Sequence, residues 1–213
     1  MPEVRTIIFM AFLFYVFTGA IFFIIDFDKK RSSAVYWGSA MLTLALGVLL
    51  IGLRNMIPDY ISVVLGNLAV VIGSSLFVFA ICDFTDRETP IKTIIIIIVN
   101  YVLFFHFFPE PKYFAMRNIM HSFVGILLTL FAVYFLFRFS DTRFTSSKRF
   151  LIFLYLFSIV IIFFRALFLF HSESSLRFFD INIFNRVYFI SVFFIPLITT
   201  FGFLLMLRQA NTK

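Results

Sequence analysis

A few strongly polar side chains occur within long apolar stretches of this sequence. Arg165 is the only charged residue well inside such a stretch, and Tyr155 and Ser158 precede it at helical spacing on the same face. An arginine in an apolar segment is costly unless it is paired, hydrated or able to reach an interface, so it marks a functional site by default. The alternative is that Arg165 extends to the lipid headgroups or braces a neighbouring helix.

Further polar residues are predicted at the same depth, whereas the inner halves of the apolar stretches carry fewer of them. We therefore predict a cavity that opens to the outer side. The predicted ligand-binding residues are Arg54, Asn67, Asn100, His121, Tyr155, Arg165 and Arg186. Cationic, amide and imidazole groups together suit a small ligand that is anionic or strongly hydrogen-bonding. Taken singly, each residue is more often a polar contact between membrane helices.

The motifs of catalysis and metal binding are missing from the sequence. There is no His-Glu-x-x-His or Gly-x-Ser-x-Gly, and the three histidines have no Cys or carboxylate at metal-ligand spacing. No Asp or Glu falls inside an apolar stretch, although proton- and sodium-coupled carriers usually keep an ion-binding group at mid-membrane. We predict no enzyme activity, no metal, no cofactor and no ion-coupled transport; an uncoupled facilitator or channel stays open.

The composition defines the elements that must position these residues. Of 213 residues, 62% are hydrophobic, 36 are Phe and 14% are charged, which excludes a water-soluble globule and a disordered chain. A single Cys, Cys82, excludes a disulfide scaffold within the chain. Seven stretches are long enough to cross about 30 Å of hydrocarbon, and lipid requires them to be helices. Their ranges are 6–25, 34–53, 60–82, 91–108, 119–137, 150–170 and 187–207. The predicted fold is an all-α polytopic membrane protein, a seven-helix bundle.

Lysine and arginine positions predict the orientation of this bundle. Of the 18 Lys and Arg, eleven lie in cytoplasmic segments and six in outer segments if the N-terminus is outside. We therefore predict an outer N-terminus and a cytoplasmic C-terminus. The net charge of +7 then reflects topology and contact with the lipid bilayer, and no nucleic-acid partner is predicted. We expect residues 1–207 to form the membrane domain and residues 208–213 to begin a cytoplasmic linker.

Small residues and one proline predict how particular helices pack. Gly66 and Gly73 give the third stretch a thin face, and Gly38 does so in the second, which favours close helix approach. Pro196 lies inside the last stretch, where we expect a kink.

The stretch Gly52–Asn67 (GLRNMIPDYISVVLGN) resembles the turn between the second and third spans of a large set of bacterial signalling proteins. In those proteins an Arg, a Pro-Asp, a Ser and an Asn recur at this spacing. Their seventh helix runs through a Thr- and Gly-containing segment into a signalling helix, to which Thr199–Phe203 (TTFGF) is similar. There a seven-helix sensory region precedes a GGDEF-type diguanylate cyclase or a histidine kinase. The resemblance implies a bacterial inner-membrane location, a cytoplasmic effector domain outside this chain and a homodimer formed through the seventh helix.

The sequence thus predicts a membrane sensor that binds a small ligand from the outer side and relays a helix rearrangement to a cytoplasmic signalling output. An uncoupled transporter or channel is the alternative. A purely structural membrane partner is a third possibility, and it predicts no cavity.

Overall fold

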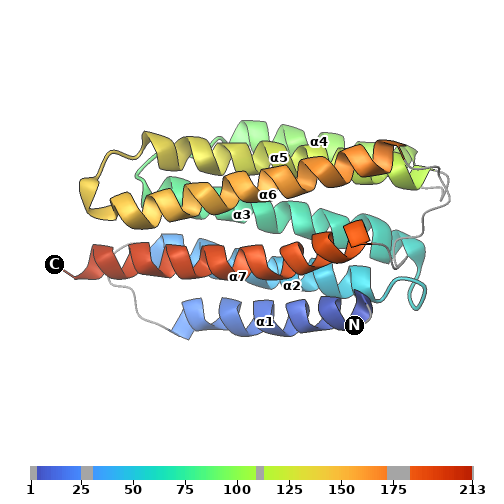
Figure 1. Cartoon of the computed structure of the whole chain (residues 1–213), viewed down its shortest axis with the longest axis horizontal. Coiled ribbons are helices and arrows are strands. Elements are labelled where there is room, and N and C mark those ends of the chain that lie inside the picture. The colour runs from blue at the N-terminus through green and yellow to red at the C-terminus, as the bar shows by residue number, and fades with distance from the viewer. Residues whose placement is uncertain (1–3, 25–30, 109–112, 172–182, 213) are drawn as a thin grey trace.

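The computed structural model describes residues 4–24, 31–108, 113–171 and 183–212. Within these ranges the chain forms a bundle of α-helices that run side by side, with the N- and C-termini at opposite ends (Figure 1). Its elements are α1 (Val4–Ile24), α2 (Arg31–Gly52), the π-helical turn η1 (Tyr60–Leu65), α3 (Gly66–Phe84), α4 (Ile91–Phe107), α5 (Phe114–Arg138), the short 3-10 turn η3 (Thr142–Phe144), α6 (Thr145–His171) and α7 (Ile183–Asn211). The predicted all-α fold is confirmed.

Six of the described helices are long and apolar enough to cross a membrane. The fourth predicted stretch forms α4, which has 17 residues and is therefore only about 25 Å long at 1.5 Å per residue. Helix ends lie within five residues of the predicted ones when η1 is counted with α3. The observed helices are mostly longer, because hydropathy marks only the hydrocarbon core and a helix can continue into the interface. α7 continues through Pro196 and past Leu207 as one α-helix.

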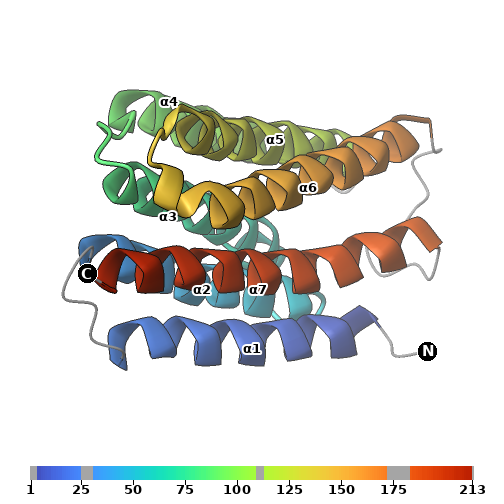
Figure 2. The same cartoon turned by 60° about the vertical axis from the view of Figure 1, so that its left-hand side comes forward.

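Six helices form a closed ring around the bundle axis. Each packs against its neighbours in the order α1, α2, α3, α5, α6, α7 and back to α1. α4 packs against α3, α5 and η1 and does not take part in the ring. Figure 2 shows α4 and α5 together on the side away from α1. The ring order determines which helix faces can line an internal space.

The close helix approach expected at Gly66 and Gly73 is present, with α2 as the neighbouring helix; at Gly38 the neighbouring helix is α1. A Cβ atom added to Gly47 would lie 2.8 Å from the carbonyl oxygen of Gly66, and one added to Gly73 would lie 3.0 Å from that of Ala40. Two helix backbones therefore touch directly, with no space for a side chain between them.

Aromatic rings fill the end of the bundle that carries the C-terminus. We call the cluster of Trp37, Phe84, Phe144 and Phe203 the aromatic plug; each of these residues is at most 3% exposed. Trp37 and Phe203 stack at 4.0 Å between ring centres, with their planes 9° apart. Phe84 makes edge-to-face contacts with Phe144 and Phe203. The plug closes this end of the ring.

Candidate functional site

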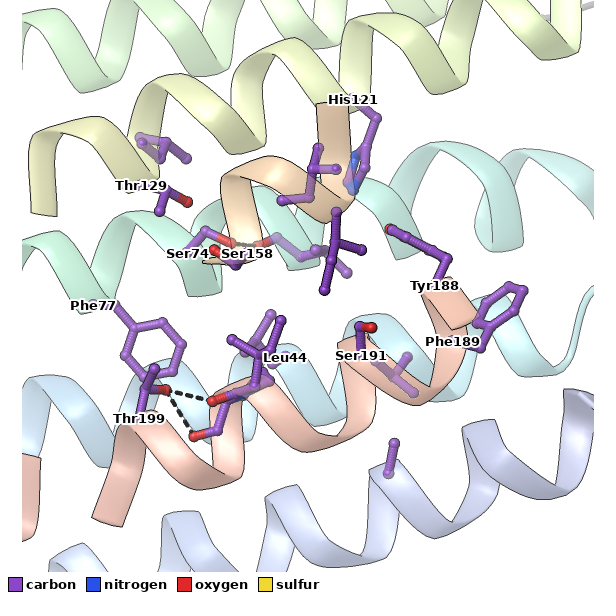
Figure 3. Close-up of a pocket in the computed structure, with 18 of the residues that line it drawn as sticks. Leu44, Ser74, Phe77, His121, Thr129, Ser158, Tyr188, Phe189, Ser191 and Thr199 are labelled. Carbon is purple, nitrogen blue, oxygen red and sulfur yellow. Dashed lines mark hydrogen bonds between the residues drawn. The ribbon is translucent and has the colours of Figure 1, made fainter. Parts of the chain in front are cut away.

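A cavity of about 210 Å³ lies inside the ring, lined by residues of all six ring helices and by none of α4 (Figure 3). Most lining residues are apolar, among them Leu44, Val48, Val70, Phe77 and Leu128. The polar lining residues are Tyr15, Asn67, Ser74, Asn118, His121, Thr129, Tyr155, Ser158, Arg165, Tyr188, Ser191 and Thr199. The cavity is thus an apolar space with separate polar points rather than a continuous polar path.

Four of the seven predicted ligand-binding residues line this cavity: Asn67, His121, Tyr155 and Arg165. They come from α3, α5 and α6. Arg186 belongs to the first turn of α7, and its side chain lies outside the described residues.

The structure does not bring Asn100 to the cavity. Asn100 is exposed on α4, and its side-chain amide donates a hydrogen bond to the carbonyl of Ile96 at 2.8 Å. The sequence predicts how deep Asn100 lies along its helix. It does not predict that α4 lies outside the ring, and for this reason Asn100 does not face the cavity.

Arg54 lies in the turn between α2 and η1 and is not among the described lining residues. Asn55 next to it has a φ of 70°, and the carbonyl of Arg54 accepts a hydrogen bond from the Arg5 guanidinium at 3.2 Å. Burial, followed by the positive charge of Arg117, lowers the pKa of Arg54 to about 10, and Asp59 opposes the shift. Arg54 belongs to a charged cluster at the turn rather than to the cavity wall.

Arg165 is 5% exposed and has few partners for a buried charge. Its Nη2 donates to Asn118 Oδ1 at 3.0 Å, and its guanidinium carbon lies 3.6 Å from the ring centre of Tyr188. Its Nε has no hydrogen-bond partner among the described residues. Among the described residues, no carboxylate forms an ion pair with Arg165. Arg165 therefore bridges α5 and α7, as the bracing alternative requires, yet its charge stays uncompensated within the described part of the chain.

Two tyrosines near the cavity differ in their hydrogen bonding. The hydroxyl of Tyr155, on a side chain only 8% exposed, has no hydrogen-bond partner in the part of the chain that the structure describes. Tyr101, on α4, places its hydroxyl 2.8 Å from Nδ1 of His121 and so orients that ring, which points into the cavity in Figure 3. A buried hydroxyl without a partner is unfavourable, so Tyr155 marks a second point where a ligand could form a hydrogen bond.

Asn118 is the clearest cavity residue that the sequence analysis missed. Its carbonyl oxygen accepts from Arg165, and it precedes His121 by three residues on the same helix face. The predicted stretch begins at residue 119, which places Asn118 in a loop, whereas α5 begins at Phe114. Helical spacing from His121 is the signal that could have found it.

The arrangement provides one positive charge and several hydrogen-bonding groups in an apolar enclosure, which suits binding of an anion. No group of three His, Cys, Asp or Glu within the described ranges could hold a metal ion. In comparisons with family models, curated proteins and solved structures, none matches this chain.

Proposed function

We propose that this chain is a transmembrane sensor module that binds a small organic anion inside the six-helix ring and relays a helix rearrangement through α7. The observation that carries the proposal is Arg165, a buried cation in a cavity with no described carboxylate partner. An arginine at the centre of a membrane helix costs about 2.5–3.5 kcal/mol on insertion scales, and Arg165, which lies nearer the end of α6, has a smaller cost of the same kind. A bound anion would offset this cost, so ligand binding favours the packing that encloses it.

α7 is the element that can carry the change along the bundle. Near one end Tyr188 lies under the guanidinium of Arg165, and farther along Thr199 lines the same cavity. One helical turn later Phe203 stacks on Trp37 in the aromatic plug. Near the end of α7, Gln209 accepts a hydrogen bond from Ser147 at 3.0 Å. A shift of α7 at the cavity would therefore alter contacts at the end that we propose to be cytoplasmic.

The proposed topology is seven crossings, with the N-terminus outside and the C-terminus in the cytoplasm. α4 has to cross with 17 residues, and a modest local thinning of the bilayer accommodates a helix of this length. The proposed location is the inner membrane of a bacterium. The output is a cyclic-di-GMP-synthesising or histidine kinase domain that receives the movement of α7.

We further propose that two copies pair through α7. Exposed apolar residues recur on this helix at intervals of three or four, the spacing of a coiled-coil seam. They are Val187, Ile190, Phe194, Ile198, Phe201 and Leu205. Pairing along this stripe would bring the two output domains together.

An uncoupled transporter or channel, the alternative function, needs a path across the membrane. The aromatic plug blocks the cavity at one end with rings that are almost fully buried, and this favours the sensor. Chloride flux through reconstituted vesicles tests the alternative directly.

Spin labels test the relay. We place one label on α2 (Ser32→Cys) and one on α7 (Arg208→Cys); both positions are exposed and lie at the end of the bundle that carries the C-terminus. The protein in nanodiscs is then titrated with linear and aromatic carboxylates. We expect a shift in the inter-label distance. A matched pair at Ser32 and Arg87, on α2 and just after α3, is expected to stay unchanged. Two results would overturn the proposed function. One is chloride flux in vesicles, and the other is a distance between the labels on α2 and α7 that no cavity-bound compound changes.

A further inference from the structure

We infer that the cavity takes an elongated monocarboxylate of about eight to ten non-hydrogen atoms that carries a hydrogen-bond acceptor, such as a hydroxyl or carbonyl, at its far end. This inference rests on the proposed function for the existence of a ligand, and it goes further by naming the ligand's class.

The charge of the site selects the head group. Arg165 is the one Lys or Arg among the described lining residues, and these include no Asp or Glu. A single carboxylate balances a single guanidinium, and its two oxygens match the fork of guanidinium donors. A phosphate monoester would bring close to two negative charges and leave one unbalanced.

The separation of the two uncommitted groups sets the length. Tyr155 and Arg165 are ten residues apart on α6, which corresponds to about 15 Å along a helix. Side chains on a helix lean in the same direction, so the guanidinium and the hydroxyl keep roughly this separation. Subtracting two hydrogen bonds of about 2.9 Å leaves about 9 Å for the ligand. An extended chain advances about 3.5 Å per three bonds, so about eight bonds fill this distance.

The cavity volume leads independently to the same size. A protein cavity of about 150 Å³ holds benzene, which has six carbon atoms. By simple proportion the cavity of about 210 Å³ described here holds roughly eight non-hydrogen atoms. Length and volume agree, and both exclude a whole phospholipid.

The residues that line the cavity between Tyr155 and Arg165 determine which chemistry suits the middle of the ligand. Leu44, Val70 and Ile162 line it, together with hydroxyls that are already used. Ser74 and Thr129 donate to carbonyls of their own helices at 2.9 and 2.8 Å, and Ser158 does so at 2.7 Å. Away from Arg165, Tyr155 is the lining residue whose hydroxyl has no hydrogen-bond partner among the described residues; its oxygen is itself buried, so a ligand reaches it as the side chains around it shift. An apolar chain suits the space between Tyr155 and Arg165.

The test uses 7-hydroxyheptanoate, which has ten non-hydrogen atoms and one group at each end. Equilibrium binding to the full chain in lipid nanodiscs is measured, with empty nanodiscs subtracted, and compared with heptanoate and 1,7-heptanediol. We expect 7-hydroxyheptanoate to bind about tenfold more tightly than heptanoate, because only the former gives Tyr155 a partner. The diol is expected not to bind measurably.

Two variants assign these differences to single groups. Tyr155→Phe is expected to reduce the tenfold preference to about one without changing the affinity for heptanoate. Arg165→Gln is expected to weaken both carboxylates at least tenfold. Arg149→Gln, the same change at an exposed position of α6, serves as the matched control and is expected to have no effect.

The outcomes separate this inference from the proposed function. Equal binding of the diol, or an unchanged preference in Tyr155→Phe, overturns the ligand class. If neither carboxylate binds while other organic anions move α7, the ligand class is wrong and the sensor stands. If 7-hydroxyheptanoate binds as expected and the spin labels do not move, the ligand class stands and the sensor is wrong.

Discussion

The indole N–H of Trp37 donates a hydrogen bond to the hydroxyl of Thr200 at 2.9 Å, joining α2 to α7 inside the bundle. The same hydroxyl donates to the carbonyl of Pro196 at 2.6 Å. Proline has no N–H and removes one backbone hydrogen bond from the helix. A continuous chain of two hydrogen bonds therefore connects α2 to the turn of α7 that is least supported by its own backbone.

Removing this connection should destabilise the bundle and free α7. We expect Thr200→Val to lower the free energy of unfolding by about 1 kcal/mol, because the buried indole N–H loses its partner. Thr200→Ser keeps the hydroxyl and should stay within about 0.5 kcal/mol of wild type. Reversible unfolding in mixed micelles measures both. A Val variant as stable as the Ser variant would show that the bond contributes nothing.

The two tyrosines should respond oppositely to loss of the hydroxyl. Tyr155→Phe removes a buried group without a partner, so we expect the ligand-free protein to become more stable by about 1 kcal/mol. Tyr101→Phe deprives His121 of its hydrogen bond and should cost about 1 kcal/mol. Thermal unfolding of both variants without ligand measures the difference. A Tyr155→Phe variant that is less stable than wild type would show that the Tyr155 hydroxyl does have a hydrogen-bond partner.

Two glycines provide a matched test of the contact between α2 and α3. Gly47→Ala places a methyl group 2.8 Å from the carbonyl oxygen of Gly66, so the helices must separate and we expect a loss of about 1–3 kcal/mol. At Gly125 the nearest atom to an added Cβ is Ile162 Cδ1 at 3.9 Å, an ordinary contact. Gly125→Ala should therefore be neutral or gain up to about 1 kcal/mol from helix propensity. Similar unfolding free energies in the two variants would rule out the direct backbone contact.

Neutralising Arg165 should cost the ligand-free protein little stability. Breaking a buried ion pair usually costs about 3–5 kcal/mol, because it leaves one charge alone. Arg165 has no such partner among the described residues, so Arg165→Gln loses a hydrogen bond and a cation–π contact but also removes an unbalanced charge. We expect the unfolding free energy to fall by no more than about 1 kcal/mol. A loss of about 3 kcal/mol or more, with Arg149→Gln unchanged, would reveal a negatively charged partner for Arg165.

Cysteine cross-linking tests the proposed α7 dimer. Phe201, on the exposed stripe of α7, is 67% exposed, and Phe163 on α6 is 51% exposed. Oxidation of membranes that contain Phe201→Cys should give a disulfide-linked dimer, whereas Phe163→Cys should stay monomeric. Cys82 is buried and should not contribute. Equal cross-linking at both positions would indicate random collisions rather than pairing through α7.

Arg165 and Asn118 show how far the sequence can lead to a site. The sequence identifies Arg165 because a charged residue is costly to place in lipid, and the apolar stretch around it is visible along the chain. Its partner Asn118 was missed because the hydropathy limit of the fifth stretch fell one residue too late. Tyr188, which lies against Arg165, is not among the predicted ligand-binding residues. Packing determines which side chains of different helices meet, so the composition of a single stretch does not predict these contacts.

Asn67 and Asn100 show that the sequence does not predict which way a side chain faces. Both were predicted to lie toward the outer side, yet Asn67 lines the cavity and Asn100 is exposed on α4. The sequence determined the all-helical architecture and the approximate helix limits, because both follow from the free energy of placing each residue type in lipid rather than water. Only the tertiary structure decided that six helices close a ring and that α4 lies outside it. Ring closure depends on which helix faces fit one another, as Gly47 fits Gly66, and that fit decides which polar side chains meet.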